Sequence, residues 1–173
     1  MIYHVLTNIS PWGPEETYRE WDSQLSRSGS TAVRVVCGDI PLEEDGLHFT
    51  KKGQTMFYDR LYEALPPSDN SLLIISDSTV DYHNRDNDDN WTGWANREMT
   101  ERFNPRRIVV DTVRGSGFTA RATHNEHFYP RLSAHIRNGF HGDILFIGGW
   151  NDHSSLTNNA IDRCVKRAMS SAR

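Results

Sequence analysis

Five short apolar stretches alternate along this chain with longer stretches of helical pattern. The most continuous one, Leu72 to Ile75, has no polar break, and the polar turn Ser76-Asp77-Ser78 follows it at once. Such a run suits a strand that is buried on both faces of a parallel sheet. Four further strands are expected from β-branched and apolar content, at residues 2–9, 32–37, 107–112 and 143–147.

Helical patterns fill the intervals between these strands. The clearest covers residues 51–64, with Thr50 as a suitable N-cap and with Phe57, Leu61 and Leu65 on its inward face. Further helices are expected at 14–28, 91–103, 125–138 and 157–170. Because each strand is followed by a helix, the pattern predicts an α/β fold, a three-layer α/β/α flavodoxin-like sandwich with a five-stranded parallel sheet.

Composition narrows the class of protein. The chain has 173 residues, which fits one domain over 1–173, with a linker-like stretch at residues 66–71. A net charge of −4 and a pI near 6.0 argue against a broad basic face for nucleic acid. No apolar run reaches the roughly 20 residues of a membrane span, and the first residues do not resemble a signal peptide. We therefore expect a cytoplasmic protein with no nucleic-acid or membrane partner.

Loops after the expected strands carry residues suited to ester hydrolysis. This reaction needs a nucleophile, a base, a group that orients the base, and donors for an oxyanion. Ser78 directly follows the buried strand, at the edge where open α/β sheets place their chemistry. Asp45 and His48 lie three residues apart on one loop, which lets the carboxylate reach the imidazole Nδ1 and leaves Nε2 facing a serine.

Two other loops offer candidate oxyanion donors. Gly117 lies in a glycine-rich turn after the strand at 107–112, where a backbone N–H can point at an anion. Asn151 follows the strand at 143–147 and carries a side-chain amide. Each of these stretches, taken alone, is more often a strand-ending turn, a helix cap or an ordinary loop. Their joint occurrence at strand ends is what favours catalysis.

Four blocks of the sequence resemble the SGNH hydrolases, also called GDSL esterases. The Gly-Asp-Ser block of that family is similar to Ser76-Asp77-Ser78, and its Ser-Gly-x-Thr turn to Ser116-Gly117-Phe118-Thr119. Its Gly-x-Asn-Asp block resembles Gly149-Trp150-Asn151-Asp152, and its Asp-Gly-x-His block resembles Asp45-Gly46-Leu47-His48. Together the blocks and their strands cover most of the chain.

The resemblance implies a role for each matching residue. Ser78 would be the nucleophile, His48 the base, and Asp45 the group that orients His48. The backbone N–H groups of Ser78 and Gly117 and the side chain of Asn151 would form the oxyanion hole. The implied activity is that of a serine esterase, which needs no cofactor and no metal.

The order of the blocks departs from the family pattern. The family places its Asp-x-x-His block last, near the C-terminus, whereas here it precedes the serine block, as in a circular permutation. A smaller departure is Ser76, which stands where the family has glycine. With the family's strand order, the permutation predicts the spatial sequence 107–112, 72–77, 143–148, 2–9 and 32–37.

The expected substrate is a small-molecule or carbohydrate ester with a short acyl group such as acetyl. A thioesterase or lysophospholipase activity, and a non-catalytic glycan-binding module on the same fold, remain as alternatives. Trp150, inside the Asn151 loop, is expected near the substrate, while Trp91 and Trp94 have the spacing of core residues. Four histidines lie between residues 124 and 141, which suggests a metal site. However, the closely spaced pair His124 and His127 has no clear third ligand.

Overall fold

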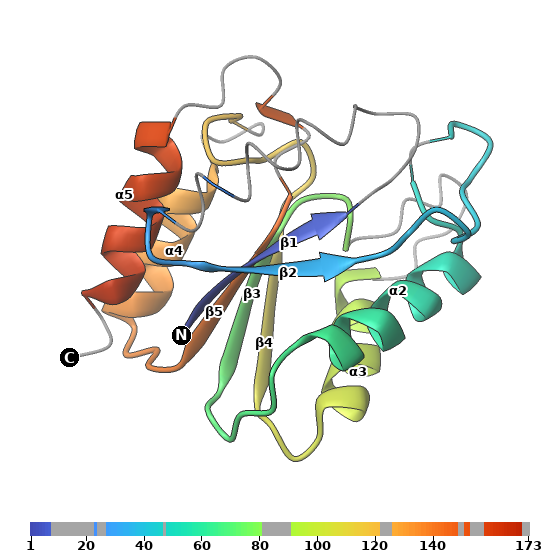
Figure 1. The fold of residues 1–173 in the computed structure, drawn as a ribbon, viewed down its shortest axis with the longest axis horizontal. Helices are drawn as coiled ribbons and strands as arrows, with labels where there is room; N and C mark the ends of the chain where they lie inside the picture. The colour runs from blue at the N-terminus through green and yellow to red at the C-terminus, as the bar shows by residue number, and fades with distance from the viewer. Residues whose placement is uncertain are drawn as a thin grey trace.

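The computed structural model describes residues 1–7, 23, 27–46, 48–80, 91–121, 126–148, 151–152 and 158–170. Within these residues the chain forms a five-stranded, all-parallel sheet and four helices (Figure 1). The strands are β1 (Ile2–Thr7), β2 (Thr31–Val35), β3 (Leu72–Ser76), β4 (Ile108–Thr112) and β5 (Asp143–Ile147). The helices are α2 (Lys51–Ala64), α3 (Trp91–Phe103), α4 (Phe128–Arg137) and α5 (Asn158–Met169).

The strand order is β2-β1-β5-β3-β4, which is the order that the permuted arrangement predicts. β3 therefore lies inside the sheet, between β5 and β4, and all five of its residues are buried. The expected α/β class and parallel sheet are confirmed. The helix expected at 14–28 lies almost wholly outside the described residues, as do the last two residues of the strand expected at 2–9.

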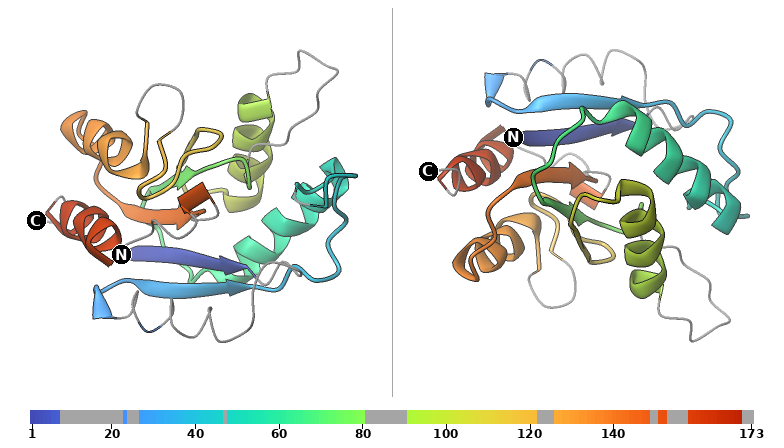
Figure 2. Two further views of the ribbon diagram at one scale, coloured as in Figure 1. Left: turned by 90° about the horizontal axis from the view of Figure 1, so that it is seen from above. Right: turned by 90° about the horizontal axis from the view of Figure 1, so that it is seen from below.

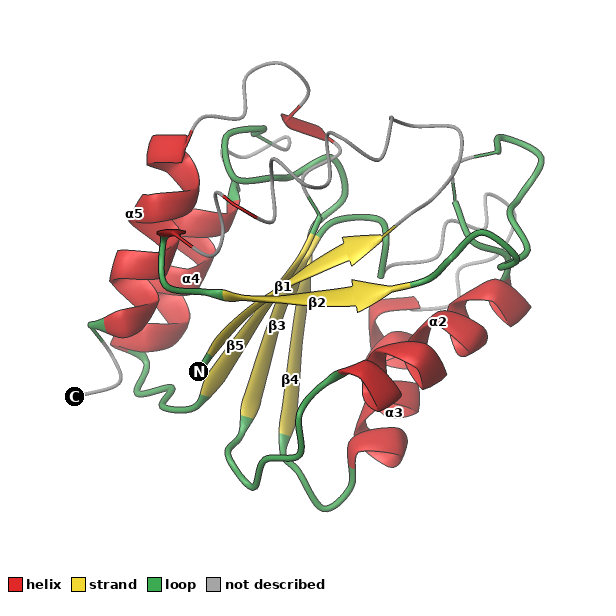
Figure 3. Ribbon diagram, in the orientation of Figure 1, coloured by secondary structure: helices red, strands yellow, loops and turns green. Residues whose placement is uncertain are grey.

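Helices cover both faces of the sheet, with α2 and α3 on one side and α4 and α5 on the other (Figures 2 and 3). The alternation of side chains along β3 divides the core accordingly. Leu72 and Ile74 pack with α2 and α3, whereas Leu73 and Ile75 pack with α4 and α5. This burial on both faces explains why the strand is an unbroken apolar run.

The start of α2 follows the sequence prediction in detail. The Thr50 side chain accepts a hydrogen bond from the Gly53 N–H at 3.0 Å, and thereby caps the helix. Phe57 and Leu61 are fully buried. No helix among the described residues is long and apolar enough to cross a bilayer.

Candidate active site

Ser78 lies at the apex of a turn that the side chain of Asp77 builds. The Oδ1 atom of Asp77 accepts hydrogen bonds from the Thr79 N–H at 2.8 Å and from the Thr79 hydroxyl at 2.6 Å. A carboxylate that bonds the N–H two residues later is an Asx turn, so the sequence Asp-Ser-Thr supplies this shape locally. Asp77 is buried while Ser78 is half-buried, and the turn lies at the carboxyl edge of the sheet, directly after β3.

The loops after the neighbouring strands are tied to this turn. The side-chain amide of Asn151 donates to Asp77 Oδ2 at 3.1 Å and to the Ser116 carbonyl at 2.9 Å. The Thr112 hydroxyl donates to the Asp77 carbonyl at 2.7 Å. The structure thus brings the loops of Ser78, Gly117 and Asn151 together, as their positions at the ends of adjacent strands predict.

Asp152 holds the loop that carries Gly117 in place through hydrogen bonds. Its fully buried carboxylate accepts the N–H groups of Phe118, Thr119 and Ala120 at 2.7–2.9 Å, and the Thr119 hydroxyl at 2.8 Å. The carboxylate lies so close that a Cβ atom at Gly117 would be 2.5 Å from it. Glycine is therefore required at this position by packing.

Burial changes the acidity of Asp77. Removal from water raises the pKa of this carboxyl above its ordinary value, and the nearby charge of Asp152 adds to the effect, while the hydrogen bonds from Thr79 oppose it. The end of β5 also lies close to the Asp77 carboxylate, because a Cβ at Gly148 would lie 2.7 Å from Asp77 Oδ2. Gly148 also has a φ of +146°, a backbone conformation that favours glycine.

The expected partnership of Asp45 and His48 is present. Asp45 Oδ2 lies 2.7 Å from His48 Nδ1, and Asp45 Oδ1 accepts the His48 backbone N–H at 3.0 Å. The His48 side chain is only 18% exposed, whereas Asp45 is 46% exposed. A carboxylate at Nδ1 fixes the ring orientation and assigns proton transfer to Nε2.

Helix α2 connects this pair to the serine turn. The Gln54 side-chain amide donates to the Thr79 carbonyl at 2.9 Å, and the Tyr58 hydroxyl donates to the Val80 carbonyl at 2.9 Å. The first two turns of α2, which begin three residues after His48, therefore pack against the loop of Ser78. Within the described residues no hydrogen bond joins the Ser78 hydroxyl to His48, a contact that is often loose before substrate binds.

Two of the three expected oxyanion donors already have partners. The Gly117 N–H donates to the Ala120 carbonyl at 3.1 Å. Both bonds of the Asn151 amide, to Asp77 and Ser116, use the nitrogen that would face an oxyanion. By contrast, the Ser78 N–H makes no hydrogen bond within the described residues. Stabilisation of an oxyanion by all three donors thus requires the first two to share or exchange their present acceptors.

Arg131 is a residue at this edge that sequence reasoning missed. Its buried guanidinium donates to the Ser76 carbonyl at 3.1 Å and to the Ser116 hydroxyl at 2.9 Å, so it joins the serine loop to the Gly117 loop. Asp111 pairs with it at 2.8 Å and also contacts His135 Nε2 at 2.8 Å. No local pattern indicates this role, because the contact from Arg131 to Ser76 spans 55 residues of sequence.

Several other sequence expectations concern side chains that are not described. Trp150 and His124 lie outside the described residues, and the side chains of Trp91 and Trp94 are likewise not described. Of the histidines considered for a metal site, His135 is bound to Asp111. Among the described residues there is no group of three potential metal ligands.

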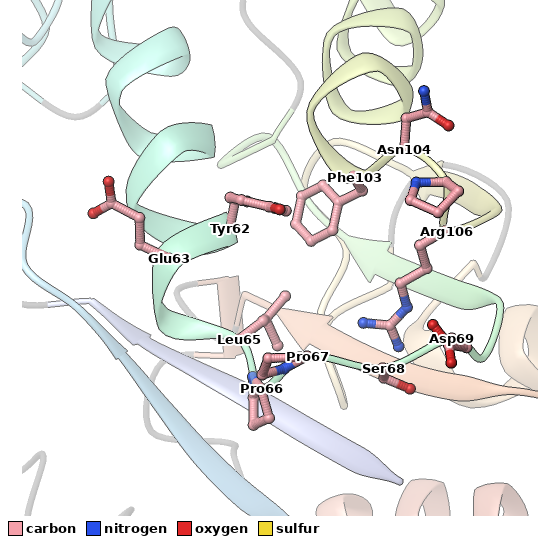
Figure 4. A pocket seen from close by; sticks show the side chains of 11 residues that line it. Tyr62, Glu63, Leu65, Pro66, Pro67, Ser68, Asp69, Phe103, Asn104 and Arg106 are labelled. Carbon is pink, nitrogen blue, oxygen red and sulfur yellow. The ribbon is translucent and has the colours of Figure 1, made fainter.

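A separate cavity of about 460 Å³ lies at the opposite, amino edge of the sheet. Figure 4 shows Tyr62 of α2 and Phe103 at the end of α3 side by side on one wall, where their ring centres are 5.1 Å apart. Pro66 and Pro67 of the linker-like stretch form another wall. Because these residues precede β3 and β4, the cavity is remote from the loops that carry Ser78, Gly117 and Asn151.

Comparison with known proteins adds no assignment. No protein-family model, no curated protein and no solved structure matches the chain.

Proposed function

We propose that the chain is a serine esterase with the residue roles of an SGNH hydrolase. Ser78 Oγ attacks the ester carbonyl, and its proton passes to Nε2 of His48. The same proton then goes to the leaving alcohol, which departs and leaves the acyl group on Ser78. Water, deprotonated by His48, hydrolyses this acyl-enzyme and restores the serine. Asp45 orients the imidazole and stabilises its protonated form.

The observation that carries this proposal is the pair of Asp45 and His48 at the start of α2. The carboxylate binds Nδ1 at 2.7 Å, which is the geometry that a general-base histidine needs. Gln54 of α2 binds the loop of Ser78, and α2 begins three residues after His48, so both halves of the proposed triad adjoin one helix.

The order of the strands supports the permuted form of the family fold. When the strands are numbered from β3, the flavodoxin-like order 2-1-3-4-5 gives β4-β3-β5-β1-β2, which agrees with the observed sheet. The linker-like segment at 66–71 would then join the positions of the family's usual termini. Permutation keeps the packing contacts and changes only where the chain is open.

The proposed substrate is an ester of a small molecule or carbohydrate with a short acyl group, and thioesters or lysophospholipids are the enzymatic alternative. A non-catalytic glycan-binding module on the same fold is the second candidate. The observation in its favour is that the Gly117 N–H and the Asn151 amide are already hydrogen-bonded within the protein.

Covalent labelling with a fluorophosphonate probe separates an esterase from a binding module. The native chain should be labelled on Ser78, identified by peptide mass, and should hydrolyse 4-nitrophenyl acetate. The Ser78→Ala variant should neither be labelled nor turn over, since loss of a triad member costs several orders of magnitude. The matched control is Ser71→Ala, a half-buried serine before β3, which should behave like the native chain. Activity of Ser78→Ala within about tenfold of native would exclude Ser78 as nucleophile.

A further inference from the structure

A small basic cavity lies beside the loop that carries Gly117. It has a volume of about 220 Å³, several times the roughly 30 Å³ that one water occupies. Phe118 and Thr119, the two residues after Gly117, form one wall. The other walls come from the residues before and within the first turn of α4, and from α5: Arg121, His127, Tyr129, Asn159, Ala160 and Arg163.

Two arginines give this cavity its charge. Within the described residues neither Arg121 nor Arg163 forms an ion pair with a carboxylate. The nearest acidic residues in sequence, Glu126 and Asp162, do not line the cavity. In a chain whose net charge is −4, two guanidiniums at one cavity, with no carboxylate partner among the described residues, mark a local positive site.

The cavity is also partly preorganised. The Arg163 guanidinium lies 4.6 Å from the centre of the Tyr129 ring, a cation–π contact that holds the plane of the guanidinium while leaving its N–H groups available. Both α4 and α5 begin at this cavity, so the positive ends of their dipoles add to its potential. Asn159 supplies a neutral polar side chain at the same place.

We propose that this cavity binds an anionic group of the substrate, a carboxylate, phosphate or sulfate, while the ester bond lies at Ser78. This inference rests on the proposed esterase function and specifies its substrate class. Guanidinium groups recognise such planar or tetrahedral anions through paired hydrogen bonds. Phe118 and Thr119 directly follow Gly117 in the chain, so the cavity adjoins the loop of a proposed oxyanion donor, and one substrate could then place its ester at the sheet edge and its anionic group here.

Matched esters test this assignment. The full chain is assayed with the 4-nitrophenyl monoester of succinic acid and with its methylated, neutral counterpart. We expect the anionic ester to have the higher kcat/KM, and Arg121→Gln with Arg163→Gln to lower that value by about tenfold or more, mainly through KM. The kcat/KM for the neutral ester should be the same in the native chain and the double variant.

The matched control is Arg107→Gln, which replaces an exposed arginine at the opposite edge of the sheet and should change neither rate. Equal anion preference in the native chain and the double variant would overturn the proposal.

Direct binding keeps this test independent of the esterase proposal. Inorganic phosphate, inorganic sulfate and succinate are each titrated calorimetrically into the native chain, the double variant and Arg107→Gln. Binding that is lost only in the double variant supports the anion site even if no ester is hydrolysed, and the tightest of the three anions identifies the preferred group. Equal binding by the native chain and the double variant, or no binding of any anion by the native chain, would refute the site.

Discussion

The side-chain amide of Asn151 donates to the buried carboxylate of Asp77 at 3.1 Å, across 74 residues of sequence. This bond ties the loop after β5 to the turn that presents Ser78. The same amide also holds the Ser116 carbonyl, one residue before Gly117. Asn151 therefore has a structural task in the folded chain beside its proposed catalytic one, and the two tasks are separable by experiment.

Replacement of Asn151 by alanine should affect both tasks. We expect kcat for 4-nitrophenyl acetate to fall by a factor that corresponds to about 2.7–4 kcal/mol, with little change in KM, because the amide would bind charge that develops only in the transition state. Loss of the hydrogen bonds to Asp77 and Ser116 should also lower the free energy of unfolding by roughly 1–3 kcal/mol. Steady-state kinetics and urea denaturation measure the two effects. A change in KM alone would place Asn151 in ground-state binding.

The pair of Asp45 and His48 should control the pH dependence of the rate. A general base must be neutral, so kcat/KM should fall on acidification and level off at higher pH. His48→Ala should abolish turnover, while Asp45→Ala should retain more activity, because Asp45 orients the ring without taking the proton. His141→Ala, a histidine before β5 at the other edge, is the control. A native rate in His48→Ala would move the search for the base to His153, which lies outside the described residues.

Gly117 should tolerate no side chain. A Cβ at this position would lie 2.5 Å from the Asp152 carboxylate, which holds three backbone N–H groups of the same loop. Gly117→Ala should therefore lower the unfolding midpoint and the esterase rate together. Gly38→Ala provides the matched control, since a Cβ there would meet no atom within 4 Å. Equal thermal stability of the two variants would show that the loop can move away from Asp152.

Asp111 should contribute to stability at neutral pH and lose that contribution in acid. Burial tends to raise the pKa of this carboxyl, but the hydrogen bond from His135 and the charge of Arg131 outweigh it and leave the pKa below its ordinary value. The stabilisation is therefore complete above the unfolded pKa of about 3.9 and disappears as pH falls through the lower folded value. Asp111→Asn should be less stable than native at pH 7, and the difference should become smaller as pH falls below about 3.9.

Urea denaturation between pH 7 and pH 3 measures the free energy of unfolding of Asp111→Asn and of the native chain. The control is Asp69→Asn, an exposed carboxylate at the opposite edge. A difference between Asp111→Asn and native that stays constant from pH 7 to pH 3 would show that the charge of Asp111 makes no net contribution.

The permuted block order predicts a functional chain in the family's own order. A chain with Arg173 linked to Met1 through a short flexible segment, and opened between Pro67 and Asn70, should fold and keep esterase activity. The opening carries a cost that the sequence does not reveal, because the Ser68 hydroxyl donates to the buried Asp143 carboxylate at 2.8 Å. We therefore expect lower stability with unchanged kcat. Loss of folding in this variant, together with native behaviour of one opened within residues 43–44, would contradict the permuted arrangement.

Local sequence determined the secondary structure and much of the serine turn. Three features depend only on neighbours within a few residues: the apolar run at 72–75, the cap at Thr50 and the Asp-Ser-Thr turn. They can therefore be predicted from the sequence. The contact of Asp45 with His48 belongs to the same class, since its members are three residues apart. The observed order of the strands also agrees with the one expected from the block order.

Tertiary structure decided how the edge of the sheet is held together. Buried polar groups must find partners wherever the fold brings them, and these partners lie far apart in sequence. Arg131 reaches Ser76 across 55 residues, and Asp152 reaches the N–H groups of Phe118, Thr119 and Ala120 across 32 to 34. In the same packing, the Gly117 N–H and the Asn151 amide donate hydrogen bonds to acceptors within the protein. The sequence alone had suggested that both donors are available to an oxyanion. A pattern of residue types shows which groups can donate, whereas only their positions in the fold show which acceptors they meet.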